Sequence, residues 1–419
     1  DKSQIMKSLK YVFGALALIA LVGGGCSGNE ESIFGIASKD PSMDVNSAGY
    51  FEEVQKVKGD NTLVRPSDII DSGQGIDGFP VITDPKFVTV SEMVDKNILF
   101  DELSGVSIKD GDTYKFYPHQ VLAWHVVVED EVNGEPVAVT FSQLTEVSKV
   151  FSRNIEGQTV SLGTSGLLWN NNVLLYDDAT QTLWSQILGV GVYGENAGVE
   201  LVEQPSVVMT WGQWSTAHPD GLVLSDDTGF TREYTRSPYG TYLTAKVILF
   251  PTTNDPVRAL EMKSIVVGVK TDGGSKAYQE GPIVQFSNSV KNDVVGETDI
   301  VVWRHEDGGM YIHLSEDVVF SSVTDIGILD REGNEWLLND ELELVFGDRV
   351  LARAETIQTF WFMWSVLHPD SHMYGNVRGK GLIDGSIDLK EGEGVKEEDG
   401  AVHLDVNDPG AGGFEFKAE

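Results

Sequence analysis

His125 is the residue of this chain whose type and neighbours most readily suggest chemistry. Glu129 and Asp130 follow it closely, and an imidazole beside carboxylates can act as a general base or as a metal ligand. The segment 118–125 predicts a short helix that His125 ends, and a predicted strand begins directly after it. The two acids therefore need not face the ring. A structural histidine, which the helix dipole favours at a helix C-terminus, is the alternative.

Ser165 lies in a second pattern that suggests chemistry. Gly163-Thr164-Ser165-Gly166 resembles part of a nucleophile motif, but no glycine stands two residues after the serine. A nucleophile elbow requires that glycine and a strand-to-helix transition, and neither is predicted here. We therefore predict a turn.

Two histidines flank a predicted hairpin turn further along the chain. His305 and His313 stand on either side of Asp307-Gly308-Gly309. Turning there would pair His305 with Met310 and Val302 with His313. The two histidines would then lie on opposite faces of the ribbon, which disfavours a shared metal.

Acidic clusters are the last candidates for a metal site. Asp226-Asp227 and the stretch 405–408 could hold calcium, but neither has the alternating oxygen spacing of an EF-hand loop. The chain also lacks a phosphate-binding glycine loop, a dinucleotide fingerprint and a haem attachment site. We therefore expect no metal and no cofactor.

The elements that must position these residues are mostly strands. Asn133-Gly134 predicts the tight turn of a hairpin between 126–132 and 135–141, because Asn-Gly adopts the positive φ angles of a two-residue turn. Short helices are predicted at 118–125 and 210–217. Further strands are predicted at 105–108, 113–117, 147–151, 158–162, 173–176, 183–187 and 264–269. The predicted fold class is β-rich α+β, with mostly antiparallel strands and a few short helices.

The composition indicates a large acidic globular protein. Its 419 residues exceed one ordinary core, so two domains or a duplicated one are expected, with a single large β-rich unit as the alternative. With 65 acidic against 30 basic residues, the formal charge is -35, which should repel nucleic acid and anionic lipid head groups. The single cysteine, Cys26, allows no intramolecular disulfide and no cysteine-built metal site.

Residues 6–26 resemble the leader of a bacterial lipoprotein. A short basic region precedes the apolar run 11–22, which is too short to span a bilayer but suits a signal-peptide core. Gly23-Gly24-Gly25-Cys26 then predicts cleavage after residue 25 and lipidation of Cys26, with a plain secretory leader as the alternative. The acidic stretch 27–31 resembles the signal that sends some lipoproteins to the outer surface. We expect an extracytoplasmic protein, anchored in the outer membrane by the lipid on Cys26 and surface-exposed.

The second half of the chain repeats the first in several ordered segments. The segments that correspond are Lys115-Phe116-Tyr117 and Lys276-Ala277-Tyr278, Val132-Asn133-Gly134-Glu135 and Val294-Val295-Gly296-Glu297, Tyr176-Asp177 with Trp184 and Leu329-Asp330 with Trp336, and Trp214-Ser215 with His218-Pro219-Asp220 and Trp364-Ser365 with His368-Pro369-Asp370. This order predicts two tandem related repeats. The predicted division is a signal peptide (1–25), a lipidated tether (26–62), a first β-rich repeat (63–256), a second, degenerate repeat (257–375) and an acidic glycine-rich tail (376–419).

A further set of segments carries a family resemblance. They are Asp77-Gly78-Phe79-Pro80, Leu122-Ala123-Trp124-His125, Gly134-Glu135-Pro136-Val137-Ala138-Val139-Thr140, Ser165-Gly166-Leu167-Leu168 with Asn170, Tyr176-Asp177, Leu183-Trp184-Ser185-Gln186, and Thr228-Gly229-Phe230 with Arg232, Tyr234, Arg236, Pro238 and Tyr239. Together they resemble the DUF3179 family, a domain of unknown function in secreted or membrane-attached proteins of bacteria and archaea. The resemblance runs from about residue 77 to residue 370 and implies little about activity.

The chain departs from that family at two points. Members typically carry a Tyr-Cys-Pro-Leu-Cys segment after the hairpin and a Glu directly after the histidine. Here the segment is Phe141-Ser142-Gln143-Leu144-Thr145, and Val126 replaces the Glu. Ser142 and Thr145 cannot supply thiolates for redox chemistry or metal binding. The resemblance therefore implies a divergent member.

We predict a surface-exposed lipoprotein that serves as a binding or assembly module of the cell envelope, with a small extracellular ligand or an envelope protein as its partner. The predicted ligand-binding residues are His125, Arg153, Asn170, Asp177, Trp184, Arg232 and Tyr234. For Asp177 and Trp184 the alternative is a purely structural role in a turn and a core. The alternative function is an extracytoplasmic hydrolase, such as one acting on glycans, with His125, Asp177 or Glu129 in acid–base roles. A subunit of a larger envelope complex is the third hypothesis.

Overall fold

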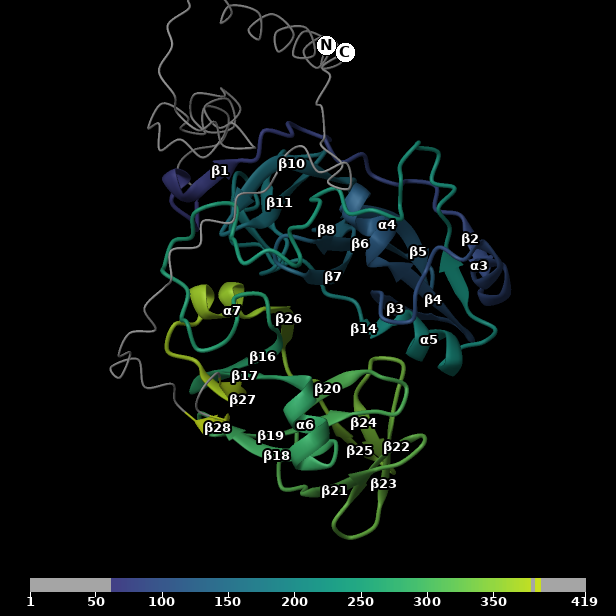
Figure 1. Cartoon of the computed structure of the whole chain (residues 1–419), viewed down its shortest axis with the longest axis vertical. Helices are drawn as coiled ribbons and strands as arrows, with labels where there is room; N and C mark the ends of the chain where they lie inside the picture. Colours follow the sequence, from purple (N-terminus) through teal and green to yellow (C-terminus); the bar gives the residue numbers. More distant parts are fainter. Residues whose placement is uncertain (1–61, 378–380, 386–419) are drawn as a thin grey trace, which may run out of the picture. The chain divides into compact units, whose positions relative to one another are not determined.

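Short strands joined by turns make up almost all of the fold, as the sequence predicts. The computed structural model describes residues 62–377 and 381–385. The predicted signal peptide, the lipidation site Cys26 and the acidic cluster 405–408 lie outside the described residues. The described part contains five short α-helices and seven sheets. Six of these sheets are larger, and they are arranged as a six-bladed propeller (Figure 1). The β-rich fold class is therefore confirmed.

The first half, up to residue 256, contains three of the larger sheets. Its first sheet, in spatial order, is β14 (Val207–Thr210), β3 (Ser104–Asp110), β4 (Thr113–Pro118), β15 (Leu222–Leu224) and β2 (Phe87–Thr89). Its second is β5 (Val127–Val132), β6 (Glu135–Ser142) and β7 (Val147–Ser152). Its third is β1 (Ile69–Asp71), β10 (Leu162–Trp169), β11 (Asn172–Asp177), β12 (Leu183–Ser185) and β13 (Val190–Tyr193), and β8 (Asn154–Ile155) pairs separately with β9 (Gln158–Thr159).

The second half contains the other three sheets. Its first sheet is β26 (Thr356–Phe360), β16 (Ile265–Thr271), β17 (Gly274–Tyr278), β27 (His372–Val377) and β28 (Gly381–Gly385). Its second is β18 (Val290–Val295), β19 (Thr298–Arg304) and β20 (Met310–Leu314). Its third is β21 (Phe320–Val323), β22 (Gly327–Asp330), β23 (Glu335–Leu338), β24 (Leu344–Phe346) and β25 (Arg349–Leu351). The helices of the described residues are α3 (Val90–Lys96), α4 (His119–His125), α5 (Trp211–Ala217), α6 (Glu280–Ser287) and α7 (Trp361–Leu367), besides the 3-10 turn η2 (Pro66–Asp68).

The first sheet of each half is mixed, and the two mixed sheets have the same arrangement. In each of them one strand pairs in parallel, β15 with β4 and β27 with β17, while the other pairs are antiparallel. In each, a strand leads into a short helix, α5 or α7, and a His-Pro-Asp turn then leads into the parallel strand. The backbone N–H of His218 and of His368 closes its helix by donating to Trp214 and Trp364 at 2.8 Å. Each His-Pro-Asp turn therefore stands directly after the end of a short helix.

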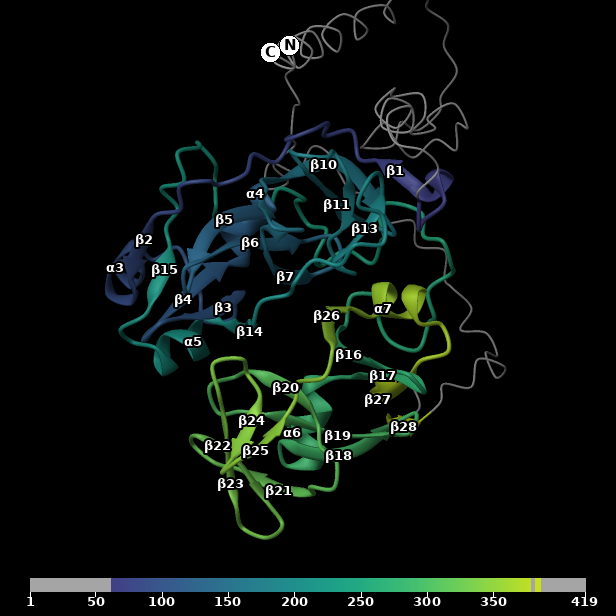
Figure 2. The same cartoon turned by 180° about the vertical axis from the view of Figure 1, so that it is seen from behind.

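The two halves are joined through β7 and β26, which lie side by side (Figure 1 and Figure 2). The Thr359 hydroxyl donates to the Thr145 carbonyl at 2.7 Å, and the Phe360 N–H donates to the same oxygen at 3.1 Å. Phe362 and Met363 of α7 belong to the same apolar cluster as Trp184 of the first half. All described residues accordingly fall within one compact unit.

Two local predictions are wrong. The segment 163–166 is not a turn but part of β10, with a register shift between Thr164 and Leu168. Gly166 has a φ of +78°, and a Cβ there would lie 2.5 Å from the Gly75 carbonyl oxygen. The glycine is thus needed for a bulge and a close backbone approach inside a strand. The Ser165 hydroxyl is buried and donates to the Leu174 carbonyl at 2.5 Å.

The hairpin around Asp307 has a different register from the predicted one. Arg304, not His305, pairs with Met310, and Val301 pairs with His313. The Asp307 carboxylate accepts from the Gly309 N–H at 2.7 Å, which keeps His305 within the turn. Both histidines contact the Trp303 ring, so they are not on opposite faces as predicted.

No helix of the described residues is long and apolar enough to cross a membrane.

Candidate functional site

A small, open pocket lies between the second and third sheets of the first half. Its volume is about 280 Å³, which suits a small ligand. The lining residues are Asp77, Pro80, Val81, Thr83, Glu129, Ser161, Leu162, Gly163, Tyr176 and Asp178. The Tyr176 hydroxyl donates to Asp77 at 2.9 Å, and the Ser161 N–H donates to Asp178 at 2.9 Å. Three carboxylates and a phenol therefore meet around one small hollow.

Glu129 on β5 is the buried carboxylate of this pocket. Its Oε1 accepts from the Leu162 N–H at 3.1 Å, and its Oε2 accepts from Arg153 at 3.0 Å. Only 6% of Glu129 is exposed. Burial raises the pKa of its carboxyl, although the Arg153 guanidinium acts in the opposite direction. A buried carboxyl with a raised pKa can bind a cation or take part in proton transfer.

In the second half, an uncharged side chain accepts the corresponding backbone N–H, and there is no ion pair at this position. Asn292 is the third residue of β18, as Glu129 is the third residue of β5. Its Oδ1 accepts from the N–H of Phe320, the first residue of β21, at 2.8 Å. Ser315 follows β20 where Arg153 follows β7. Because a neutral amide holds the corresponding backbone, holding the strand does not by itself require the Glu129–Arg153 pair.

His125 lies behind the pocket wall and is fully buried. Its Nδ1–H donates to the carbonyl of the pocket residue Pro80 at 2.7 Å, since a carbonyl can only accept. Its Nε2 then accepts from the Tyr234 hydroxyl at 2.7 Å, and Thr228 donates to Tyr234 at 2.5 Å. Neither ring nitrogen is left for a substrate or a metal. Glu129 and Asp130 bond to Arg153 and Lys115 instead.

Burial lowers the pKa of His125 from 6.5 to about 4. The unfolded chain therefore takes up this proton at a higher pH than the folded protein, so the stabilisation is complete above pH 6.5 and is lost as the pH falls toward 4. We expect His125→Gln to be less stable than the parent protein at pH 7. The difference in their free energies of unfolding should be smaller by roughly 2 kcal/mol at pH 4.5. Urea unfolding at the two pH values measures this. The matched control is the exposed His372: His372→Gln should cost little stability at pH 7. If the stability difference between His125→Gln and the parent protein were the same at both pH values, the ring of His125 would not be buried in its neutral form.

Asp177 and Trp184 form a structural pair. Asp177 Oδ2 accepts from the Trp184 indole N–H at 2.9 Å and from the Thr180 hydroxyl at 2.7 Å, while Oδ1 accepts from the Thr180 N–H at 2.5 Å. Asp177 and Trp184 are fully buried. Asp330 and Trp336 repeat the bond in the second half at 3.1 Å. Asp177 and Trp184 therefore make the contacts of a turn and a buried core, which is the structural role given as their alternative.

The predicted site residues do not converge on one point. His125 and Tyr234 bond to each other, and Arg232 lies close enough to help lower the pKa of His125. Asn170 accepts from the Thr253 N–H at 2.7 Å and holds a loop. Of the seven, Arg153 and His125 contact pocket residues directly, through Glu129 and Pro80. Sequence reasoning missed Asp77, Tyr176 and Asp178, although the first two belong to segments that carry the family resemblance.

Ser142 and Thr145 lie side by side in the buried interior. The Thr145 hydroxyl donates to Ser142 Oγ at 3.1 Å, and Asn172 donates to Thr145 at 2.9 Å. Asn172 also donates to Gln186 at 2.8 Å, and Gln186 donates to Thr140 at 3.0 Å. The positions where the resembling family carries two cysteines are therefore occupied by a closed hydroxyl–amide network.

The acidic pair proposed for calcium is otherwise engaged. Asp226 pairs with Lys96, and Asp227 pairs with Lys86 at 3.0 Å. Across residues 62–377 and 381–385, no group of three or more His, Cys, Asp or Glu side chains is placed to hold a metal ion.

Comparison with known proteins gives one match. A search of curated proteins and a search of solved structures each found none. The model of the family described as "Protein of unknown function (DUF3179)" matches residues 76–371. That segment includes the pocket, His125 with its hydrogen-bond partners, the whole first mixed sheet, and the second mixed sheet except β27 and β28. The chain belongs to the DUF3179 family.

Proposed function

We propose that this protein is a binding module of the cell envelope and that its ligand site is the pocket between Asp77 and Asp178. The observation that carries the proposal is the difference between Glu129 and Asn292. Both side chains accept a backbone N–H from the neighbouring sheet, but only the first half adds a buried carboxylate and its arginine. Buried ion pairs are weak devices for stability, so we assign this pair to the pocket that Glu129 lines.

The pocket favours a small cationic ligand. Asp77 and Asp178 add two carboxylates beside Glu129, and no lysine or arginine lines the hollow. Charge-assisted hydrogen bonds to an ammonium group are the strongest that such a lining can make. The Tyr176 ring beside them offers a face for apolar or cation–π contact. An amine or an amino sugar fits this chemistry.

Calorimetry with glucosamine and spermidine tests the site. N-acetylglucosamine is the matched neutral probe, because it lacks the amine charge. We expect the amines to bind and the neutral sugar to bind at least about tenfold more weakly. Asp77→Asn with Asp178→Asn should weaken amine binding by about tenfold or more, because the amides keep the size and some hydrogen bonds but lose the charge.

The second half provides the control for non-specific attraction to an acidic protein. Asp299 and Asp317 line a corresponding hollow of about 270 Å³. Asp299→Asn with Asp317→Asn removes the same total charge and should leave amine binding unchanged. Equal weakening in both double variants would show that net charge alone attracts the probes, and the pocket assignment would be abandoned.

We also propose the anchoring that the leader predicts. Lipidation of Cys26 would hold the module at the outer membrane, with the pocket facing outward on its tether. This rests on the basic, apolar and Gly-Gly-Gly-Cys pattern of residues 6–26. Labelled palmitate should be incorporated into the parent protein and not into Cys26→Ser.

A tandem origin of the two halves is part of the same proposal. It is supported by the shared arrangement of the mixed sheets and by the paired polar contacts of Asp177 with Trp184 and Asp330 with Trp336. The two copies would then have diverged at this hollow: the first has the buried pair of Glu129 and Arg153, where the second has Asn292 and Ser315.

A hydrolase is the second candidate, and one observation favours it. The raised pKa of Glu129 suits a general acid, with Asp77 or Asp178 as the ionised partner in the same pocket. His125 and Asp177 are both fully engaged in structural hydrogen bonds and give this candidate no support. Turnover of chromogenic glycosides that is lost in Glu129→Gln would favour it over simple binding.

A further inference from the structure

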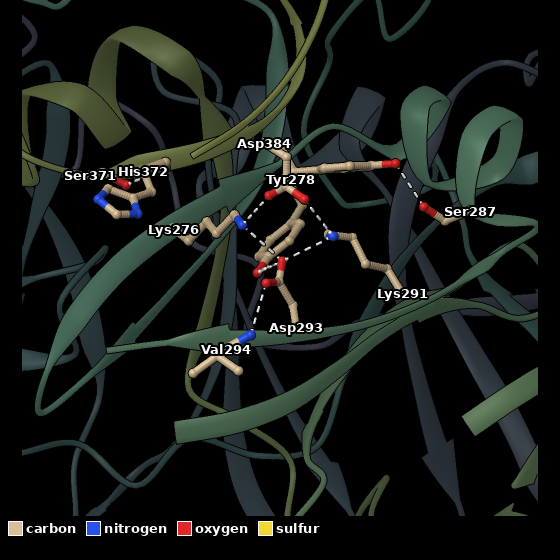
Figure 3. A network of polar contacts seen from close by, with 10 residues as sticks. Lys276, Tyr278, Ser287, Lys291, Asp293, Val294, Ser371, His372 and Asp384 are labelled. Carbon is tan, nitrogen blue, oxygen red and sulfur yellow. Dashed lines mark hydrogen bonds and ion pairs between the residues drawn. The ribbon is translucent and has the colours of Figure 1, made fainter. Parts of the chain in front are cut away.

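The outer strand of the second mixed sheet is attached in an unusual way. β28 pairs antiparallel with β27, and its Asp384 stands opposite Tyr374. Tyr374 in turn stands opposite Tyr278 on β17. Figure 3 shows Asp384 above Tyr278, between two lysine side chains that come from β17 and β18. The strand is thus held by charged groups as well as by its backbone.

The two lysines need this carboxylate. Lys276 Nζ lies 2.9 Å from Asp293 and 2.5 Å from Asp384, and Lys291 Nζ lies 2.8 Å from Asp384 (Figure 3). Their side chains are only 6% and 14% exposed. The Tyr278 hydroxyl also donates to Asp293 at 3.0 Å. Without Asp384, two largely buried ammonium groups would share one carboxylate, which is costly in a low-dielectric setting.

The first half attaches its outer strand by apolar packing instead. β2 occupies the place of β28. Phe87 pairs with Leu224 as Asp384 pairs with Tyr374. Val128 is the second residue of β5, as Lys291 is the second residue of β18. Phe87 and Val128 belong to one apolar cluster. An apolar attachment in one half thus corresponds to an ionic attachment in the other.

The second acidic partner of the corresponding lysine, Lys115 or Lys276, also comes from a different strand in each half. In the first half, Lys115 pairs with Asp130 and with Asp110, the last residue of β3. The last residue of β16 is Thr271, which has no carboxylate to offer. The second half therefore takes its second acid from β28, which is the edge strand of its sheet among the described residues.

We propose that the outer edge of β27 is a strand-binding site for an extended segment that carries a carboxylate, and that Gly381–Gly385 of the same chain is its exchangeable occupant. The backbone of β27 supplies the ladder, as in other cases of strand addition. Lys276 and Lys291 supply selectivity for an acidic residue opposite Tyr374. Ionic attachment makes the occupant releasable, since it weakens with salt whereas apolar attachment does not.

Hydrogen exchange on the full chain tests the ionic attachment. We expect Asp384→Asn to speed exchange in β28 by about tenfold or more, while Asp110→Asn leaves β3 unchanged, because β3 is held between β4 and β14. In the parent protein, raising NaCl from about 0.05 M to about 1 M should speed exchange in β28 and not in β2. Unchanged protection of β28 in Asp384→Asn would overturn the proposal.

A peptide added in trans tests the exchange. A fluorescein-labelled peptide of residues 380–386 should bind to the full-length Asp384→Asn variant, whose edge is freed, and at least about tenfold more weakly to the parent chain. The same peptide with Asn in place of Asp384 should not bind to either. Lys276→Met with Lys291→Met, made in the Asp384→Asn chain, should lose the peptide while the circular dichroism spectrum is kept. The proposal would be overturned if the Asn peptide bound as well as the Asp peptide, or if the two Lys→Met substitutions left peptide binding unchanged.

Discussion

Arg153→Met is expected to lower the free energy of unfolding by about 3–5 kcal/mol at pH 7, because it leaves Glu129 buried without its cation. The loss should shrink as the pH falls. Glu129 has a raised pKa in the folded protein, so the folded state binds the proton at a higher pH than the unfolded chain, and protonation removes the unpaired charge. Denaturant unfolding at pH 7 and pH 5 measures both effects.

The double variant Glu129→Gln with Arg153→Met is the matched control. Both side chains become neutral at similar size, and Gln can still accept the Leu162 N–H, as Asn292 accepts the N–H of Phe320. We expect its stability to lie within about 1.5 kcal/mol of the parent protein. A double variant as unstable as Arg153→Met would mean that the ion pair is needed for stability. There would then be no reason to assign the pair to ligand binding.

Asp177→Ala should also be strongly destabilising, by about 3 kcal/mol or more, because it leaves several buried donors without an acceptor, among them the Trp184 indole. Asp330→Ala should show a loss of the same kind, since Asp330 accepts from Trp336 in the second half. Thermal unfolding measures both. Amine binding, measured well below the melting temperature, should be unchanged in Asp177→Ala. Lost binding in the folded variant would return Asp177 to the ligand site.

The sequence predicted best those features that depend on near neighbours. Asn133-Gly134 produced the expected hairpin, and the helix predicted at 210–217 ends at Ala217. The prediction failed at Gly163–Gly166, because its composition is that of a turn. The bulge that needs Gly166 is imposed by Gly75, far away in the sequence. The predicted pairing of His305 with Met310 was wrong. Asp307 accepts a hydrogen bond from Gly309 within the turn, and His305 belongs to the loop and not to the strand.

The candidate site was harder to predict than the fold. Asp77, Glu129 and Asp178 come together only because separate sheets pack against each other, and spacing in the sequence carries no trace of that. Arg153 was among the predicted ligand-binding residues, but its partner Glu129 was considered beside His125 and as an acid–base residue of a hydrolase, not as the partner of Arg153. The ring of His125 instead faces Pro80 and Tyr234, which come from segments on either side of it in the sequence.

The contact between β26 and Thr145 has a consequence for how this protein can be handled and how it can change. Residues of the second half complete the apolar interior around Trp184, so we expect the two halves to unfold together. A gene fragment that ends at the midpoint would encode a protein with an open core. We therefore expect loss of either half to expose this apolar interior, whereas substitutions within each half leave it covered.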